Sequence, residues 1–392
     1  MVQLPRLIKR GRKRWIAGAV LVAAMAGAGG WIAANRASPV PNARLTATRL
    51  KLAAEHAPPA PKALQAELDA LVRGYGEEVG VAVTDVKTGW TAGVDAERPY
   101  PQQSVSKLWV AMTVLRAVDE GRMDVDATVT LTDADRSVFF QPVAYNIGKA
   151  GFTTQISALL RRAIVESDNA ANDKLMREIG GPEAVGQALE DMGLNDVRVG
   201  AYERDLQART AGVVWRPEYG VGWNFQAARA ALPRAEREAA LDAYLAAPLD
   251  GASPAGITRT LAALQRGEIL RPESTARLLE LMAHVRTGPR RLKGGLPPGW
   301  SIGHKTGSGQ ILNGVQAGYN DIGILTSPDG RHYAVAVMIG RTSVPNLTRM
   351  QLMQNVTRAV VAYDEAQRGS DRPRRARDEE AKPDRETEGT TY

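Results

Sequence analysis

Residues 103–115 have the sequence Gln-Ser-Val-Ser-Lys-Leu-Trp-Val-Ala-Met-Thr-Val-Leu, which predicts a buried helix with a serine and a lysine at its start. Apolar residues fill nearly every position after Lys107, and Gly121 is expected to end the helix. Ser104 and Lys107 lie three residues apart, so their hydroxyl and amine meet on one helix face. They are therefore a candidate nucleophile and base, although a serine N-cap followed by a solvated lysine gives the same pattern.

The composition allows one large domain or two smaller ones, because 44% of the 392 residues are hydrophobic. The chain has no cysteine, which excludes disulfides and thiolate metal sites. Its four histidines show no ligand spacing, so we expect neither a metal nor another cofactor. Six basic residues lie among the first fourteen, and without them the net charge of +7 falls to about +1. This balance gives no sign of a nucleic-acid partner.

The first 36 residues are typical of an export segment. A basic flank precedes residues 15–34, a run of twenty residues without a charge, which suits either a cleaved signal peptide or an uncleaved signal anchor. The positive flank stays cytoplasmic, so we expect a periplasmic protein, either soluble after cleavage or tethered to the inner membrane. Residues 37–60 contain four prolines and are typical of a linker.

The remaining chain has expected strands at both ends and expected helices in its middle. A strand is predicted at 79–83, a second one directly after the turn that follows it, and further strands at 302–307, 321–326 and 332–339. Helices are predicted at 61–75, 156–165, 182–192, 224–247, 254–284 and 346–366. This order predicts an α+β sandwich: a mainly antiparallel sheet built from both chain ends, flanked by helices, with an inserted all-helical lobe. A cleft between the two lobes is the expected place for chemistry. Residues 367–392 are mostly charged and predict a disordered tail.

Three short motifs occur in one order, namely Ser104-Val105-Ser106-Lys107, Ser167-Asp168-Asn169 and Lys305-Thr306-Gly307. Each motif is weak alone, but the ordered set is the one found in class A β-lactamases and penicillin-binding proteins. Residues 61–366 therefore resemble a serine β-lactamase of class A type. A second K-T-G, at residues 87–89, precedes the serine, and we interpret it as a turn between two strands.

The resemblance implies a role for each motif. Ser104 would attack a strained β-lactam amide, Lys107 would take or relay its proton, and Ser167 would pass a proton to the departing nitrogen. The backbone N–H groups of Ser104 and Ser308 would hold the oxyanion. The implied substrate-binding residues are Asn169, Lys305, Thr306, Gly307, Ser308, Arg291, Phe140 and Gln207. Two of these have open alternatives, because Arg291 could be a surface charge and Phe140 could belong to the core.

Hydrolysis also needs a group that activates water. Glu203 lies 36 residues after Ser167, the spacing at which class A enzymes carry the glutamate that does this. Gln207 stands where these enzymes usually have a water-holding asparagine, and Ala201 where they usually have an arginine that bridges to an aspartate. A loop insertion follows at about 207–250. Because these departures surround the deacylation residues, acylation is better supported than fast turnover.

Three hypotheses for the function follow. The first is an exported enzyme, active as a monomer on a small-molecule β-lactam, whose Ser104 acyl-enzyme is hydrolysed with the help of Glu203. The second is a D-Ala-D-Ala peptidase or esterase, similar to penicillin-binding proteins, with slow deacylation. The third is an envelope binding protein that keeps this scaffold without the reaction, and the presence of every reactive residue argues against it.

Overall fold

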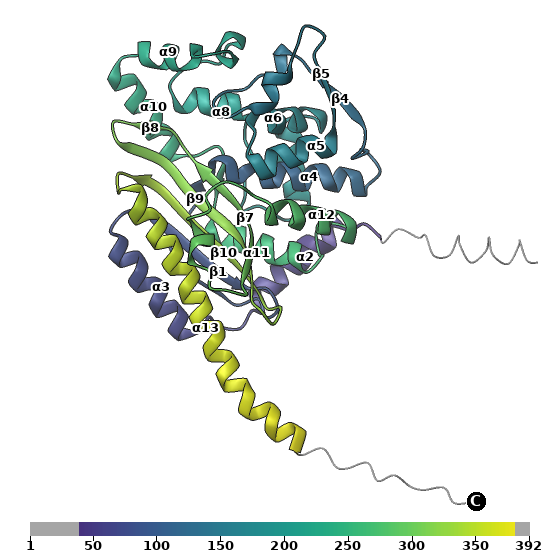
Figure 1. Ribbon diagram of the computed structural model, residues 1–392, viewed down its shortest axis with the longest axis vertical. Helices are drawn as coiled ribbons and strands as arrows, with labels where there is room; N and C mark the ends of the chain where they lie inside the picture. The colour runs from purple at the N-terminus through teal and green to yellow at the C-terminus, as the bar shows by residue number, and fades with distance from the viewer. Residues whose placement is uncertain (1–38, 381–392) are drawn as a thin grey trace, which may run out of the picture. The chain divides into compact units, whose positions relative to one another are not determined.

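The computed structural model describes residues 39–380, in which a six-stranded antiparallel sheet carries helices on both faces (Figure 1). The predicted export segment, residues 1–36, lies outside the described residues, as does the end of the predicted tail, residues 381–392. Among residues 39–380, no helix combines the length and the apolar character that a membrane span requires.

The main sheet is built from both ends of the chain. Its strands are β1 Val79–Asp85, β2 Thr91–Val94, β7 Ser301–Ser308, β8 Ile311–Leu312, β9 Val315–Thr326 and β10 His332–Thr342. The order is β2-β1-β10-β9-β7, with β8 paired to β9, so β1 lies directly beside the last strand of the chain. The expected α+β architecture is confirmed, and β7 forms one edge of the sheet.

The helices supply the other layers. They are α2 Ala43–Glu55, α3 Lys62–Tyr75, α4 Lys107–Asp119, α5 Ile156–Arg161, α6 Asn169–Glu178, α7 Pro182–Asp191, α8 Glu203–Thr210, α9 Asn224–Ala231, α10 Arg234–Ala246, α11 Pro254–Gln265, α12 Pro272–Ala283 and α13 Asn346–Glu380. Side chains alternate across a strand, so Val335 and Val337 of β10 pack in the core with α3 and α13. Ala334 and Ala336 face the other core, which includes α4 and α11.

The helical lobe, formed by α4 to α8, differs from the expectation in one respect. Two short strands, β4 Thr128–Leu131 and β5 Phe152–Gln155, pair in antiparallel fashion within it. Both are rich in threonine and other residues that favour strands, which explains why they pair although helices surround them. The prediction of an all-helical lobe was therefore wrong at this pair of strands.

The insertion folds against the lobe through a small apolar cluster. Residues 224–247 form two helices, α9 and α10, because Pro233 lacks an N–H and restricts the residue before it. The Trp223 side chain is 79% exposed. Phe225 is buried instead, in a cluster with Val138 and Ala208, and Trp215 packs at the edge of this cluster.

The two chain ends show more helix than expected. The stretch 37–60, expected to be a linker, contains α2, which contacts α7 and α11 and whose Thr46 hydroxyl donates to the Glu268 carbonyl at 2.9 Å. At the other end, α13 continues to Glu380, so the first part of the predicted disordered tail is helical. The second K-T-G lies in the β1–β2 turn as predicted, with Thr88 N donating to Asp85 Oδ1 at 2.6 Å.

Candidate active site

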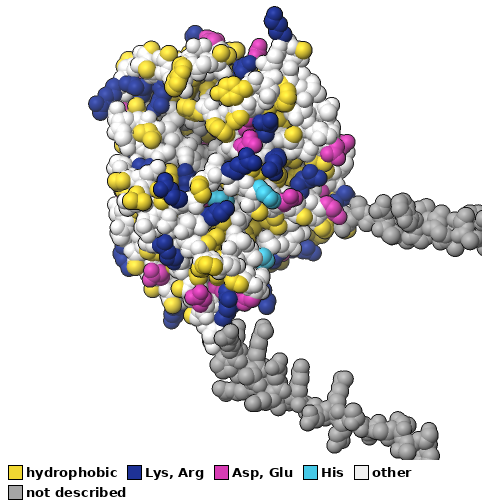
Figure 2. Space-filling model, viewed as in Figure 1, with side chains coloured by type: hydrophobic (Ala, Val, Ile, Leu, Met, Phe, Trp, Pro, Cys, Tyr) yellow, Lys and Arg dark blue, Asp and Glu magenta, His cyan; other side chains and the backbone are white. Residues whose placement is uncertain are grey.

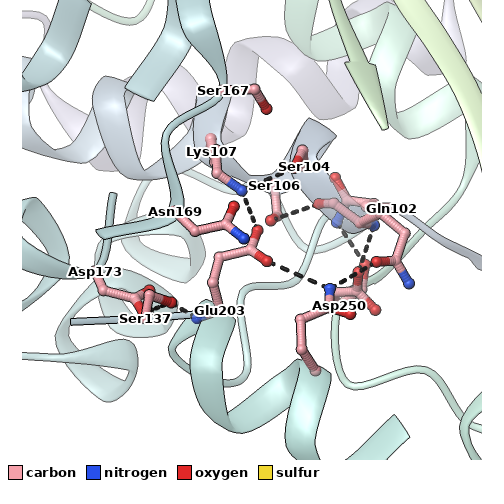
Figure 3. A network of polar contacts seen from close by, with 12 residues as sticks. Gln102, Ser104, Ser106, Lys107, Ser137, Ser167, Asn169, Asp173, Glu203 and Asp250 are labelled. Carbon is pink, nitrogen blue, oxygen red and sulfur yellow. Dashed lines mark hydrogen bonds and ion pairs between the residues drawn. The ribbon is translucent and has the colours of Figure 1, made fainter. Parts of the chain in front are cut away.

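Ser104 and Lys107 lie where a short 3-10 turn, Gln103–Ser106, leads into α4. Lys107 is completely buried and its Nζ donates to Ser104 Oγ at 2.9 Å. The same ammonium forms an ion pair with Glu203, so Lys107 lies between the two oxygens in Figure 3. A buried charge is tolerated only where it is paired and hydrogen-bonded, and this one meets both conditions. The alternative of a solvated lysine is therefore wrong.

Glu203 is held by a carboxylate that the sequence motifs did not reveal. It is the first residue of α8, and its backbone N–H donates to Asp173 Oδ1 at 2.7 Å. Asp173 Oδ2 accepts from Arg204 N at 3.2 Å and from the Ser137 hydroxyl at 2.9 Å (Figure 3). A carboxylate there satisfies N–H groups that the first turn of a helix leaves unpaired. Burial, and then the charge of Glu203, raise the pKa of Asp173 to about 6.

Gln207 lies one helical turn after Glu203 and connects it to the 3-10 turn Gln103–Ser106, which we call the nucleophile turn. Its Nε2 donates to Gln103 Oε1 at 2.8 Å and lies 3.4 Å from Glu203 Oε2. Its own carbonyl oxygen, Oε1, accepts from Gln310 Nε2 at 3.0 Å. Gln207 stands in the place of the usual asparagine, and its side chain therefore still contacts the Glu203 carboxylate.

Ala201 leaves the insertion without the expected arginine bridge, and a tyrosine–aspartate pair connects the insertion to the nucleophile turn. Tyr244 of α10 donates its hydroxyl to Asp250 Oδ1 at 2.9 Å and accepts from Gln103 Nε2 at 2.6 Å. Asp250 Oδ2 accepts from the backbone N–H of Gln103 at 2.6 Å. Burial raises the pKa of Asp250 to about 6. No sequence motif marks either residue, because the pairing depends on how the insertion folds back.

The S-D-N motif is presented by an unusual turn. A π-helical turn, Arg162–Glu166, ends at Ser167, whose φ of +65° lies in the left-handed region. Asp168 then caps α6 by accepting from Ala171 N at 3.0 Å. Strained backbone of this kind persists where surrounding contacts fix it, and here it orients Ser167 toward β7.

Lys305 on β7 meets that serine from the opposite wall. Its Nζ donates to Ser167 Oγ at 2.9 Å and to the Thr306 carbonyl at 3.0 Å. Lys305 is completely buried, and burial together with the charge of Lys107 holds its pKa well below the usual range. The S-D-N serine and the K-T-G lysine are thus one hydrogen-bonded pair across the cleft.

The outer edge of β7 supplies the remaining groups. Gly309 N donates to Gly318 O in β9 at 2.9 Å, so the N–H of the preceding residue, Ser308, points to the unpaired side of the strand. Arg291 is buried, and its guanidinium donates to Ser308 Oγ at 2.6 Å and to Gly307 O at 2.9 Å. The alternative of Arg291 as a surface charge is wrong.

These groups surround a cleft of about 640 Å³. The predicted residues along its lining are Ser104, Phe140, Ser167, Asn169, Glu203, Gln207, Arg291, Thr306 and Ser308. The ring of Phe140 is 55% exposed at the rim, so the alternative of a core residue is wrong. Asn169 donates its amide to Val138 O at 2.8 Å, which leaves its carbonyl oxygen for a ligand. Lys107, Lys305 and Gly307 do not line the cleft themselves, although Lys107 and Lys305 hydrogen-bond to the serines that do.

Comparisons with known proteins agree with this geometry. Residues 63–364 match the model of the beta-lactamase enzyme family. The extended-spectrum beta-lactamase PER-1 of Pseudomonas aeruginosa is 29% identical over 305 residues, covering 77% of this chain and 87% of that protein. A beta-lactamase of Streptomyces lavendulae is 28% identical and covers 71% of this chain and 77% of its own length.

Solved structures show the same relationship. The TLA-1 extended-spectrum beta-lactamase superposes with a TM-score of 0.64 at 25% identity, covering 77% of this chain and 99% of its own. An ancestral class A beta-lactamase gives a TM-score of 0.61 at 28% identity, covering 76% and 99%. Since the family model spans most of the chain and the three motifs converge on one cleft, the chain belongs to the beta-lactamase enzyme family, among the class A serine enzymes.

Proposed function

We propose that the protein hydrolyses β-lactams through an acyl-enzyme on Ser104, which water activated by Glu203 then releases. One observation carries the proposal: the buried Lys107 ammonium contacts both Ser104 Oγ and the Glu203 carboxylate. A single proton can therefore move between the nucleophile, the lysine and the glutamate without entering solvent.

Acylation uses the groups on both walls of the cleft. Ser104 Oγ attacks the lactam carbonyl while Lys107 passes one proton to the Glu203 carboxylate and takes the serine proton in its place, and the negative oxygen that forms is held by backbone N–H groups of Ser104 and Ser308. The carbon–nitrogen bond then breaks, and Ser167 gives a proton to the nitrogen. Lys305, 2.9 Å from Ser167 Oγ, can replace that proton and attract the carboxylate of the substrate.

Deacylation depends on Glu203, which is 3% exposed and borders the cleft beside Ser104. Its carboxylate would remove a proton from water as the oxygen attacks the ester carbonyl, and Ser104 Oγ would leave with a proton from Lys107. Gln207 and Asp173 support this role, because they hold the side chain and the backbone of Glu203 in place.

We also propose that the enzyme is exported to the periplasm as a monomer. The basic flank and the charge-free run at residues 15–34 support export, through either a cleaved signal or a membrane anchor.

The test is to mix the protein with benzylpenicillin and follow substrate loss and intact protein mass over time. The wild type should consume the penicillin without a lasting adduct. Glu203→Gln should accumulate an adduct on Ser104 and deacylate at least about 100-fold more slowly, the scale of one general base. Glu236→Gln, at an exposed position on α10, is the matched control and should behave as the wild type.

Three other outcomes of this experiment would contradict the proposal in whole or in part. A long-lived adduct on the wild type would favour the penicillin-binding alternative, with slow deacylation. If Glu203→Gln hydrolysed benzylpenicillin as fast as the wild type, only the role assigned to Glu203 would be wrong. No adduct and no substrate loss in the wild type would contradict the proposal as a whole.

A further inference from the structure

The insertion places one positive charge on the rim of the cleft. Arg229 of α9 lines the cleft together with Phe139, Phe140 and Ile311, and it belongs to the 207–250 insertion. It lies outside all three motifs. The other charged residues of the lining already contact protein groups: Glu203 pairs with Lys107, Glu166 with Arg162, and Arg291 donates to two carbonyls and the Ser308 hydroxyl.

Arg229 lacks a negative partner within residues 39–380. Its Nη2 donates to the Ile311 carbonyl at 2.6 Å, and no carboxylate of the described chain lies within ion-pair distance. A guanidinium has five N–H donors, so most of them remain for another ligand. The side chain is half-buried, which makes the missing counter-charge more costly than it would be in open solvent.

The surroundings of Arg229 add to this positive charge. Burial, and then the charge of Arg237 on α10, lower the pKa of Arg229. In Figure 2, Lys and Arg side chains gather over α10 at the edge of the molecule. An anion bound at Arg229 would offset both the burial and the repulsion, so the rim is electrostatically suited to negative charge.

The position of α9 indicates which part of a substrate would meet this charge. Phe225 and Arg229 are one helical turn apart and share a face of α9. The Phe225 ring packs edge-on against Phe139 at 5.3 Å, while Arg229 reaches the Ile311 carbonyl just beyond the end of β7. The helix thus connects the two walls of the cleft on the side where Phe140 and Asn169 lie. On that side, the carbonyl oxygen of Asn169 would accept from the amide N–H of the acyl side chain, so this side would receive that part of a β-lactam.

We propose that Arg229 forms a subsite for β-lactams whose acyl side chain carries a carboxylate. The inference rests on the proposed function, since it places the lactam ring at Ser104. A carboxylate on the side chain would pair with the guanidinium, which binds such groups through two parallel hydrogen bonds. Phe139, Phe140 and Ile311 would pack against the apolar part of the same side chain.

The test compares benzylpenicillin with its α-carboxy derivative, which differs by one carboxylate on the side chain. The measured quantity is the ratio of the two KM values, carboxylated over plain. In Arg229→Gln this ratio should rise about fivefold relative to the wild type, the scale of one partly exposed ion pair. Arg229→Lys should restore part of the difference. Raising the salt concentration should increase the ratio in the wild type but not in Arg229→Gln.

The matched control is Arg234→Gln, which removes a positive charge from α10, where Arg234 is exposed and pairs with Glu238. Its KM ratio should equal that of the wild type. An unchanged ratio in Arg229→Gln, or an equal change in Arg234→Gln, would overturn the subsite. If the wild type did not hydrolyse benzylpenicillin, the proposed function itself would fail, and that result is separate from a failure of the ratio.

Discussion

Lys107 and Lys305 carry the two amines of the site, and both are completely buried. Each is close to a serine hydroxyl, at 2.9 Å in both cases. They differ in their counter-charge, because Lys107 is paired with Glu203 while Lys305 donates to a hydroxyl and a carbonyl. Lys305 is thus the amine that gains most from the arrival of a negatively charged substrate group.

Tyr244 gives a test of how the insertion is fixed. Tyr244→Phe removes the hydroxyl that joins Gln103 Nε2 to Asp250 Oδ1 and leaves both buried groups short of a partner. We expect a loss of about 1–3 kcal/mol in the free energy of unfolding, the cost of such unsatisfied groups. Urea unfolding measures it. Tyr145→Phe removes the same hydroxyl from a side chain that is 91% exposed, and it should leave the unfolding midpoint unchanged.

At the scale of elements, the site depends on the close approach of β7 to the turn before α4. A Cβ atom added at Gly307 would lie 2.2 Å from the carbonyl oxygen of Gln102, which is a backbone atom and cannot turn aside. Gln103 next to it has a φ of +54°, so the nucleophile turn is already strained. The edge strand and the turn can approach this closely only because Gly307 has no side chain.

Gly307→Ala should therefore push β7 away from the nucleophile turn. We expect kcat/KM for benzylpenicillin to fall by about tenfold or more, because the Ser308 N–H would move away from the oxyanion. The free energy of unfolding should fall by about 1–3 kcal/mol through overpacking. Gly186→Ala in α7 is the control, since its added Cβ meets open space, and it should gain about 0.5–1 kcal/mol. Full activity in Gly307→Ala would contradict this account of β7.

At the scale of the whole molecule, folding buries two carboxyl groups, and their hydrogen bonds hold the Glu203 loop and the nucleophile turn. Asp173 and Asp250 contact the Glu203 loop and the nucleophile turn, and each has a pKa raised to about 6, chiefly by burial. A carboxyl whose pKa is raised on folding binds more protons in the folded state than in the unfolded state. Its contribution to stability therefore falls as the pH rises from about 4 to about 6 and is constant above that.

Asp250→Asn should remove one of these titrations. The unfolding free energy of the wild type minus that of the variant should fall on the order of 2–3 kcal/mol between pH 4 and pH 7, from a shift of about two units. Urea unfolding across this range measures the difference. Asp126→Asn, at an exposed position, provides the reference series. A difference that grew with pH would show that the carboxylate of Asp250 stabilises the fold more than its burial costs.

The sequence by itself determined the sheet strands, the helix after Ser104 and most residues of the site, because short motifs and hydrophobic periodicity are local. Ser104, Lys107, Ser167 and Lys305 could be named in advance since each stands at a fixed place in a motif. Local pattern also misled at the strand pair β4–β5, where the sequence predicted an all-helical lobe.

Only the tertiary structure decided what surrounds those residues. Asp173, Tyr244 and Asp250 hold the site through contacts across as many as 148 positions of sequence, and no motif marks them. Arg229 reached the rim for the same reason, since the path of the insertion depends on Phe225 packing against Phe139. Many residues satisfy the same local rules, and long-range packing decides which of them come into contact. The residues that hold the site in place and the charge at its rim could therefore be identified only from the folded chain.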